Sequence, residues 1–327
     1  MELNKSKLIG VGTFGCVYRP PLCRSNLDSP TQDLVGKIAF PYTIEREINI
    51  GNAIRNSIPD WSQYYGLLTG HQCQFEITDT LKSECAVFKK TTPDKHKLIR
   101  SYSSPYLGTS LFYYKNPITG SWLWNSTVHL IKGLAELHKN RIYHLDISSA
   151  NILIDNTGTC RLIDFGASIM DPTPEIMEDR KYGFFDKNPL FYNVYETQND
   201  FGLDFDYDIY SNNKLLNTYY KNYNTRSKFF DPHYEKDTAS DVIKNYINLG
   251  SQRKYLENIV IPNLGKIDLY RLGNTIDEFY GYHPNKPQIR ETAPHLRTLL
   301  NGMIQVDLNS QWDMDRCLEF INSHNVQ

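Results

Sequence analysis

Two short polar motifs on either side of a predicted hairpin constrain the fold more than any other feature of the sequence. The first is His144-Leu-Asp-Ile-Ser-Ser-Ala-Asn151 and the second is Leu162-Ile-Asp-Phe-Gly166. The apolar runs 151–154 and 161–163 are joined by Asp-Asn-Thr-Gly158, a sequence typical of a hairpin turn. Loop Asp and Asn residues usually form turns. Here they flank apolar runs at matching positions, so we expect their side chains to converge.

Asp146, Asn151 and Asp164 are the polar residues of these motifs that could carry chemistry. Phosphoryl transfer needs a carboxylate near the attacking hydroxyl and oxygen ligands for Mg²⁺. Two carboxylates and an amide at this spacing meet that need. The motifs therefore favour a phosphoryl-transfer site.

A glycine-rich turn lies between two predicted strands within residues 6–19, in the sequence Gly10-Val11-Gly12-Thr-Phe-Gly15-Cys-Val17. Glycines let backbone N–H groups approach phosphates without obstruction by a Cβ atom. The same pattern opens dinucleotide-binding domains, but there it leads into a helix. Here the strand resumes at Val17 and breaks at Pro20. Taken alone, the pattern also fits a plain hairpin turn.

Lys37 lies within a predicted apolar strand, residues 34–40, where a buried ammonium group needs a partner. The next apolar periodicity predicts a helix over 43–58, with Thr43 as its N-cap. Glu47 on that helix is the candidate partner. The alternative is a lysine at the strand edge that extends into solvent.

In this order, the motifs resemble those of the eukaryotic-type protein kinase superfamily. The resemblance implies an α+β, bilobal protein-kinase-like fold with a small β-rich N-lobe and a larger, mainly α-helical C-lobe. It implies one protein kinase domain over 1–327. The N-lobe is expected at 1–103, the hinge at 104–108 and the C-lobe at 109–327, with an enlarged segment at about 170–262.

The resemblance also implies a role for each motif residue. Asp146 would be the catalytic residue, and Asn151 and Asp164 would bind the metal ion. Asp268 would begin the central helix of the large lobe and brace the catalytic loop through backbone hydrogen bonds, with Asp208 as a competing assignment. The cofactor-binding residues would be Gly10, Val11, Gly12, Gly15, Val17, Lys37 and Glu47.

The function implied is that of an ATP-dependent Ser/Thr protein kinase, which uses ATP and Mg²⁺ and transfers the γ-phosphoryl group to a protein hydroxyl. Two catalytic-loop positions depart from the family. Leu145 replaces an Arg that normally binds a phosphate on the activation loop. Ser148 replaces a Lys that stabilises the transferred group, which suggests lower activity or a substitute cation.

The motifs that shape the peptide-binding site in the family are altered further in this sequence. No Ala-Pro-Glu motif follows Gly166, and Glu196 and Glu235 are equally good substitutes for its glutamate. The late-domain Arg that pairs with that glutamate is replaced by Gln311. We expect the enlarged segment to replace the lost structure, and substrate docking is its other interpretation.

These departures keep two alternatives open. One is an ATP-binding pseudokinase scaffold with little catalysis, although such proteins usually lose at least one of the essential residues. The other is a small-molecule kinase, which shares the His-x-Asp loop followed by Asn. The complete glycine-rich turn and the Asp-Leu-Tyr-Arg-Leu-Gly sequence that begins at Asp268 argue against it.

Charge and composition restrict the partners and the cellular location that we expect. Among 327 residues the formal net charge is −2, without a Lys/Arg block, which argues against nucleic-acid and membrane partners. No apolar stretch is long enough to span a membrane. Six scattered cysteines favour reduced thiols over a disulfide framework or a metal site. We expect an intracellular, cytoplasmic protein. Similar kinases occur in large DNA viruses, which would place it in a host cell or virion.

Overall fold

A computed structural model describes residues 6–12, 15–22, 33–68, 72–89, 98–178, 256–305 and 309–324. The chain divides into two compact units. The first comprises residues 1–109 and 153–168, and the second comprises residues 110–152 and 169–327. Most of the enlarged segment predicted at about 170–262 lies outside the described residues.

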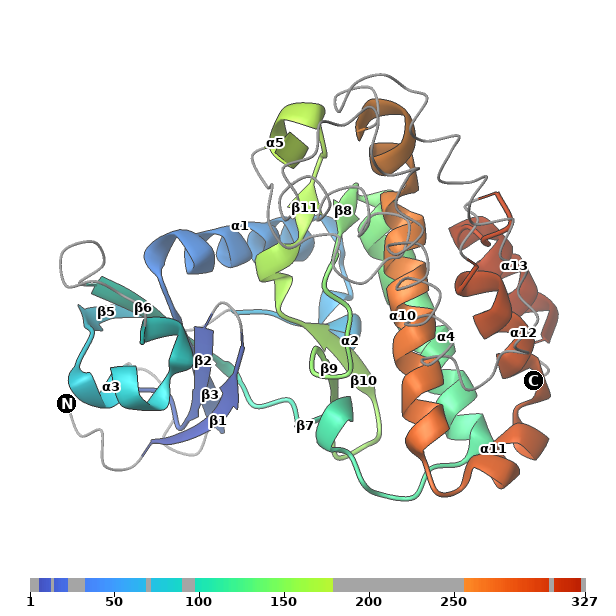
Figure 1. Cartoon of the computed structure of the whole chain (residues 1–327), viewed down its shortest axis with the longest axis horizontal. Coiled ribbons are helices and arrows are strands. Elements are labelled where there is room, and N and C mark those ends of the chain that lie inside the picture. Colours follow the sequence, from blue (N-terminus) through green and yellow to red (C-terminus); the bar gives the residue numbers. More distant parts are fainter. Residues whose placement is uncertain are drawn as a thin grey trace, which may run out of the picture. The chain divides into compact units, whose positions relative to one another are not determined.

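The first unit is built on a five-stranded antiparallel sheet with the order β1-β2-β3-β6-β5 (Figure 1). In the register of β2 and β3, Val17 lies opposite Lys37 and Cys16 lies opposite Ile38. Because neighbouring residues of a strand face opposite sides, each pair marks one face of the sheet. The strands are β1 (Lys7–Val11), β2 (Gly15–Arg19), β3 (Leu34–Ala39), β5 (Gln72–Glu76) and β6 (Leu98–Pro105).

Helix α1 (Pro41–Ser57) follows β3 directly and carries Glu47. Its N-cap is Phe40, without a side-chain hydrogen bond, so the prediction of Thr43 as N-cap is wrong. Proline explains the earlier start, because its fixed φ suits the first helical turn and its missing N–H is not needed there. The helix ends at Ser57, one residue before the predicted end at Ile58.

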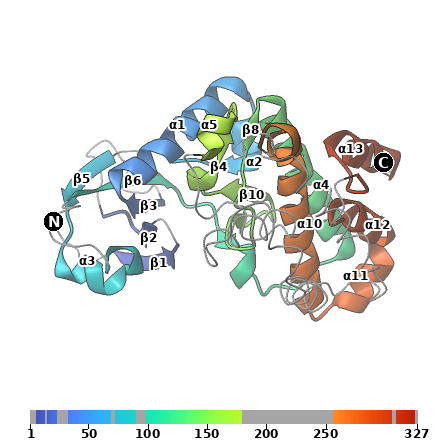
Figure 2. The same cartoon turned by 45° about the horizontal axis from the view of Figure 1, so that its top comes forward.

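A short helical segment covers the face of the sheet that carries Cys16 and Ile38. It consists of α3 (Asp79–Glu84) and η2 (Ala86–Phe88), between β5 and β6. Leu81 and Phe88 pack there in one buried cluster with β2 and β3 residues. Figure 2 shows α3 beside β1 and β2, as Figure 1 does. We call α3 and η2 the helical cover.

A disulfide joins the helical cover to the glycine-rich turn. Cys16, directly after Gly15, bonds Cys85, with their Cα atoms 6.0 Å apart, and both residues are fully buried. Cys73 on β5 is also disulfide-bonded. The prediction of reduced thiols is therefore wrong for these three, whereas Cys160 and Cys317 are buried thiols outside any disulfide. Sequence spacing missed the bond because the two cysteines are 69 positions apart and meet only through the sheet.

Removing this disulfide should lower stability strongly. For a loop of 69 residues, the chain-entropy model gives about 4 kcal/mol, or roughly 10 °C in Tm. We expect Cys16→Ala/Cys85→Ala to melt that much lower than wild type in calorimetry without reductant. The difference should shrink in dithiothreitol, and a Cys160→Ala/Cys317→Ala control should keep the wild-type response to reductant. Equal melting of wild type and the first variant in oxidising buffer would contradict the assignment.

A second sheet carries the predicted hairpin, with strand order β4-β10-β9-β7. The turn between β9 and β10 is held by Asp155, whose carboxylate accepts hydrogen bonds from the N–H groups of Thr157 and Thr159. Gly158 has a φ of 84°, a conformation that favours glycine. The hairpin prediction is confirmed. The elements are α2 (Trp61–Tyr64), β4 (Tyr65–Gly66), β7 (Thr109–Ser110), β9 (Ile152–Ile154), β10 (Cys160–Ile163) and η4 (Phe165–Ala167).

The second unit is mainly helical and centres on α10 (Leu264–Tyr282), which packs beside α4 (Gly120–Lys139) (Figures 1 and 2). A Cβ atom at Gly273 would lie 2.8 Å from a side-chain carbon of Ile304, so glycine permits close packing against the end of α12. The other elements are η3 (Leu111–Tyr113), β8 (Ile142–Tyr143), β11 (Ile169–Met170), α5 (Pro174–Glu178), η5 (Leu256–Val260), η6 (Ile261–Asn263), α11 (Lys286–Thr292), α12 (Pro294–Met303) and α13 (Met314–His324).

A β-rich first unit and a mainly helical second unit confirm the predicted α+β, kinase-like fold class. The central helix predicted to begin at Asp268 is present but begins earlier, at Leu264. Thr119 caps α4 by accepting a hydrogen bond from the N–H of Trp122. None of the helices in the described ranges has the length and apolar character needed to cross a membrane.

Candidate active site

The glycine-rich turn joins β1 and β2, and the N–H of Gly12 donates to the carbonyl of Gly15 at 2.9 Å. Gly15 has a steric reason to be glycine. A Cβ atom there would lie 2.4 Å from the carbonyl oxygen of Ile38 on β3. Gly10 and Val11 end β1, and Val17 lies on β2 opposite Lys37. Residues 13 and 14 lie outside the described ranges.

Lys37 forms two ion pairs within the first unit. Its Nζ lies 2.7 Å from Glu47 Oε2 on α1 and 2.7 Å from Asp164 Oδ1 after β10. The side chains of Lys37 and Glu47 are 10% and 7% exposed, so this pair is shielded from water. The predicted Lys37–Glu47 pair is present, and the alternative of a lysine extending into solvent is wrong.

The pKa values follow from burial and from the mutual contacts. Burial alone lowers the pKa of Lys37, but the carboxylates of Asp164 and Glu47 outweigh burial and raise it above its usual value. Lys37 therefore stays charged at neutral pH. Burial raises the pKa of Glu47 to about 7, against the opposing effect of Lys37. Glu47 therefore titrates near neutral pH.

This titration predicts a pH dependence of stability. The pKa of Glu47 rises from 4.5 to about 7 on folding, so between these values the folded protein holds a proton that the unfolded chain releases. The stability that Glu47 contributes is complete below pH 4.5 and is lost as pH rises through 7. Glutamine mimics the protonated acid. We expect the Tm of wild type, relative to Glu47→Gln, to fall between about pH 5 and about pH 8 in thermal-shift measurements. Parallel Tm profiles for the two proteins would contradict this.

Asp164 and the two residues after it connect β10 to α1 through several contacts. Asp164 has a φ of 64°, a region that non-glycine residues rarely adopt. Its carboxylate accepts a hydrogen bond from the N–H of Gly166, and the N–H of Phe165 donates to Glu47. The buried Phe165 ring packs edge-to-face on Tyr65 at 5.8 Å. These contacts fix the carboxylate of Asp164 beside Lys37.

In the second unit, Asp268 on α10 holds residues 144–151, the candidate catalytic loop, at its start. Its carboxylate accepts hydrogen bonds from the N–H of His144 at 2.8 Å and from the N–H of Leu145 at 2.7 Å. This confirms the bracing role predicted for Asp268. Burial raises the pKa of Asp268, but the hydrogen bonds, with His138 first among them, outweigh burial and lower it. The competing residue Asp208 lies outside the described residues.

Asp146 and Asn151 lie together in the catalytic loop. The Asn151 amide nitrogen donates to the Asp146 carbonyl at 2.8 Å and to Asp146 Oδ2 at 3.0 Å. Both bonds use the amide nitrogen of Asn151 and not its side-chain oxygen. The Asp146 side chain is 33% exposed, so it is accessible from solvent.

Two residues of this network were missed by sequence reasoning. Arg271 donates to the Leu145 carbonyl and lies 3.4 Å from Asp146 Oδ1, and His138 on α4 lies 3.0 Å from Asp268. Arg271 follows Asp268 by three positions on one helix, so both side chains lie on the same face. The available signal was an Asp and an Arg at that spacing within the mostly apolar stretch 267–272. His138 gave no comparable signal, because a histidine near a helix end is common.

Gln311, where the family has an arginine, is buried and bridges two helices. Its side-chain nitrogen donates to the carbonyls of Lys266 on α10 and Met303 on α12. This position therefore stabilises helix packing in the second unit. The two candidates for the missing glutamate, Glu196 and Glu235, lie outside the described residues.

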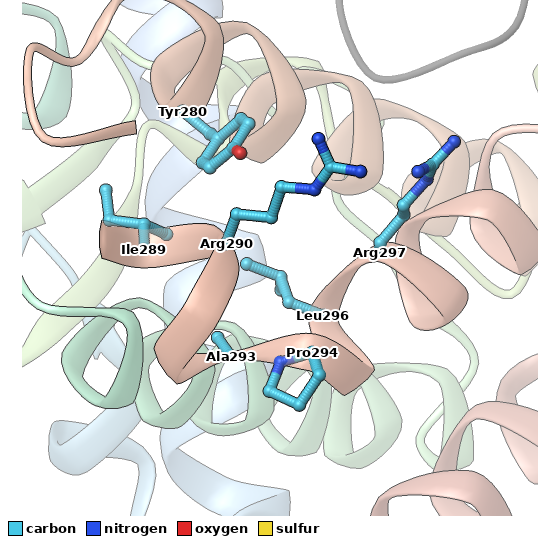
Figure 3. A pocket seen from close by; sticks show the side chains of 7 residues that line it. All are labelled: Tyr280, Ile289, Arg290, Ala293, Pro294, Leu296 and Arg297. Carbon is cyan, nitrogen blue, oxygen red and sulfur yellow. The ribbon is translucent and has the colours of Figure 1, made fainter. Parts of the chain in front are cut away.

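A pocket in the second unit is formed by residues of α10, α11 and α12 (Figure 3). Apolar side chains line it, together with the exposed arginines Arg290 and Arg297. None of the predicted site residues belongs to it, so we assign it no part in phosphoryl transfer. Its lining residues are Tyr280, Ile289, Arg290, Ala293, Pro294, Leu296 and Arg297.

The two units and their motifs define a protein-kinase-like fold, and comparison with known proteins agrees. The protein kinase domain family matches residues 90–181, which include both polar motifs of the sequence. Mitogen-activated protein kinase kinase kinase 5 of Arabidopsis thaliana is 28% identical over 175 residues, 50% of this chain and 21% of that protein. Mitogen-activated protein kinase kinase kinase ANP1, also of Arabidopsis thaliana, is 45% identical over 181 residues, 50% of this chain and 22% of the relative.

A third relative is the probable cyclin-dependent kinase 9 of Caenorhabditis elegans, 28% identical over 171 residues, 50% of this chain and 32% of that protein. The chain thus spans 21% to 32% of the length of these three relatives. The matches confirm the resemblance to the eukaryotic-type protein kinase superfamily that the motifs indicate.

Proposed function

We propose that the chain is an ATP- and magnesium-dependent protein kinase that phosphorylates Ser or Thr hydroxyls. One observation carries the proposal: Lys37 contacts both Glu47 and Asp164 at 2.7 Å, in a chain that also keeps Asp146 and Asn151. A scaffold that only binds ATP has no need to keep all five of these residues. All three relatives are named as kinases, which supports the reaction class.

The residues fit the substrate ATP and its metal ion. Lys37 stays charged and is held at two points, as a phosphate-binding cation should be. Asp164 and Asn151 offer a carboxylate and an amide oxygen, the hard ligands that Mg²⁺ prefers. When bound, the ion would neutralise negative charge on the phosphates. Gly15 begins β2 and packs closely against β3, which fixes one side of the glycine-rich turn.

Within the reaction, Asp146 orients the acceptor hydroxyl and accepts its proton. The hydroxyl oxygen forms a bond to the γ-phosphorus while the bond from that phosphorus to the bridging oxygen of ADP breaks. Asn151 and the α10 contacts hold Asp146 during this step. Lys37 binds the phosphates. The catalytic loop has no arginine near Asp146 of the kind that tyrosine kinases place there, which favours Ser and Thr as acceptors.

An ATP-binding scaffold is the second candidate, and Ser148 is the observation that favours it. A Lys normally stands at this position and stabilises charge on the transferred group. The Ser148 carbonyl instead accepts a hydrogen bond from the N–H of Asn151, a structural contact within the loop. A rate of transfer far below that of ordinary kinases would fit this candidate.

Acceptor identity tests the proposal. The purified chain is incubated with Mg²⁺ and γ-labelled ATP on peptide arrays that differ only in Ser, Thr or Tyr, and on small alcohols such as choline. We expect label on Ser and Thr peptides. Label confined to the alcohols would indicate a small-molecule kinase. ATP-induced thermal stabilisation without transfer would indicate a scaffold.

A further inference from the structure

Arg271 is a buried cation directly beneath the catalytic loop. Its side chain is 3% exposed, and it lies on α10, 125 positions from Asp146 in sequence. One guanidinium nitrogen, Nη1, donates to the Leu145 carbonyl and lies 3.4 Å from Asp146 Oδ1. Charge interactions are stronger in such a water-poor setting than at the surface. Arg271 is therefore placed to act on the carboxylate.

The two oxygens of Asp146 have different partners. Oδ1 faces Arg271 at 3.4 Å, and Oδ2 accepts a hydrogen bond from Asn151 at 3.0 Å. A carboxylate held at one oxygen can still rotate about its last side-chain bond. Contacts at both oxygens oppose that rotation. The orientation of Asp146 thus depends on both neighbours.

Side chains of α10 also bind the loop backbone, both at its N–H groups and at a carbonyl group. Asp268 accepts from the N–H groups of His144 and Leu145, while Arg271 donates to the carbonyl of Leu145. Leu145 has a φ of 60°, a region unfavourable for leucine. One turn of α10 therefore stabilises a strained backbone directly before Asp146. The Leu145 side chain carries no charge. The positive charge next to the loop comes from Arg271 on α10.

We propose that Arg271 is a positioning residue that orients the Asp146 carboxylate from beneath the catalytic loop, so that the loop carries its own permanent cation. This inference rests on the proposed function, because it assigns a role in the same transfer step. It predicts that Arg271 acts on the chemical step rather than on ATP binding, since Lys37, not Arg271, contacts the phosphates in the proposed mechanism.

The alternative is that Arg271 only stabilises the second unit. Charge-preserving and neutral variants separate the two roles. Arg271→Met keeps the length of the side chain without charge, and Arg271→Lys keeps a charge. Asp277→Asn is the matched control, because Asp277 is fully buried further along the same helix. A loss of stability alone should affect the Met variant and this control similarly.

Two measurements are made on each variant. Steady-state kinetics give kcat and the KM for ATP, with kcat counted per molecule competent to bind ATP. We expect Arg271→Met to lower kcat about 10- to 100-fold, the range typical of residues that orient a functional group. The KM for ATP should stay within about twofold, and Arg271→Lys should recover part of the kcat. Hydrogen exchange of residues 144–152 should accelerate in Arg271→Met and not in Asp277→Asn.

The outcomes are distinguishable. A kcat of Arg271→Met within about twofold of wild type would overturn the inference, and so would an equal loss in Asp277→Asn. If the wild type transfers no phosphoryl group, the proposed function fails, and hydrogen exchange still tests whether Arg271 holds the loop. Unchanged exchange in residues 144–152 would then overturn the inference. If Arg271→Met does not fold, Arg271→Lys decides: a partly reduced kcat with an unchanged KM for ATP supports the inference, and an equal reduction of kcat in Asp277→Asn overturns it.

Discussion

Replacing Asp146 by Asn is expected to lower the rate of phosphoryl transfer by at least about 100-fold, in line with the loss of a general base. Asn has the same shape, and it can keep the contact to Asn151 that Asp146 makes at 3.0 Å. What it loses is the capacity to accept the proton of the acceptor hydroxyl. Transfer is measured as labelled peptide formed from γ-labelled ATP.

ATP binding should be nearly unchanged in the same variant, because the proposed phosphate-binding residue is Lys37. Asp171→Asn is the control. Asp171 forms an exposed ion pair with Arg141 in the same unit, so its loss removes a carboxylate without touching the loop. Its transfer rate should match wild type within about twofold. Transfer by Asp146→Asn at the control's rate would contradict the catalytic assignment.

Replacing Lys37 by Met should remove most activity and much of the stability of the first unit. Lys37 is the cation between Glu47 and Asp164, so its loss leaves two carboxylates close together without compensation. Breaking a buried pair in this way costs about 3–5 kcal/mol. Transfer should fall by at least about 100-fold, because the phosphates lose a preorganised cation. Calorimetry and the peptide assay measure the two effects.

A double variant separates stability from activity. Lys37→Met/Glu47→Gln neutralises the buried carboxylate that the single change leaves behind, so we expect its Tm to recover toward wild type. Activity should not recover, because no cation remains to bind the phosphates. Recovery of transfer in the double variant would show that Lys37 acts only through stability.

The features that could be predicted from the sequence are those that depend on residues close together in the chain or on a recognisable motif. The hairpin between the two polar motifs follows from a local turn sequence, and the Lys37–Glu47 pair follows from a lysine in an apolar strand before a helix. Asp268 was predicted from its motif, and its hydrogen bonds to the catalytic loop are present. The roles assigned to the ATP- and metal-binding residues stay predictions, since they concern bound molecules.

What the sequence did not predict depends on contacts between distant residues. The Cys16–Cys85 bond requires the helical cover to fold over β2, and no spacing rule describes that. Arg271 reaches the catalytic loop only because Asp268 anchors α10 beneath it. The start of α1 was misplaced for a local reason: a capping preference was given to Thr43 although Pro41 fits the first turn.

The most direct test of this account is a time course of γ-phosphoryl transfer from ATP to Ser and Thr peptides, with ATP binding measured on the same preparation. We expect ADP and phosphopeptide to form in equal amounts, EDTA to stop the reaction, and Asp146→Asn to show only background. ATP binding by the wild type, with no phosphopeptide above the Asp146→Asn background, would contradict it.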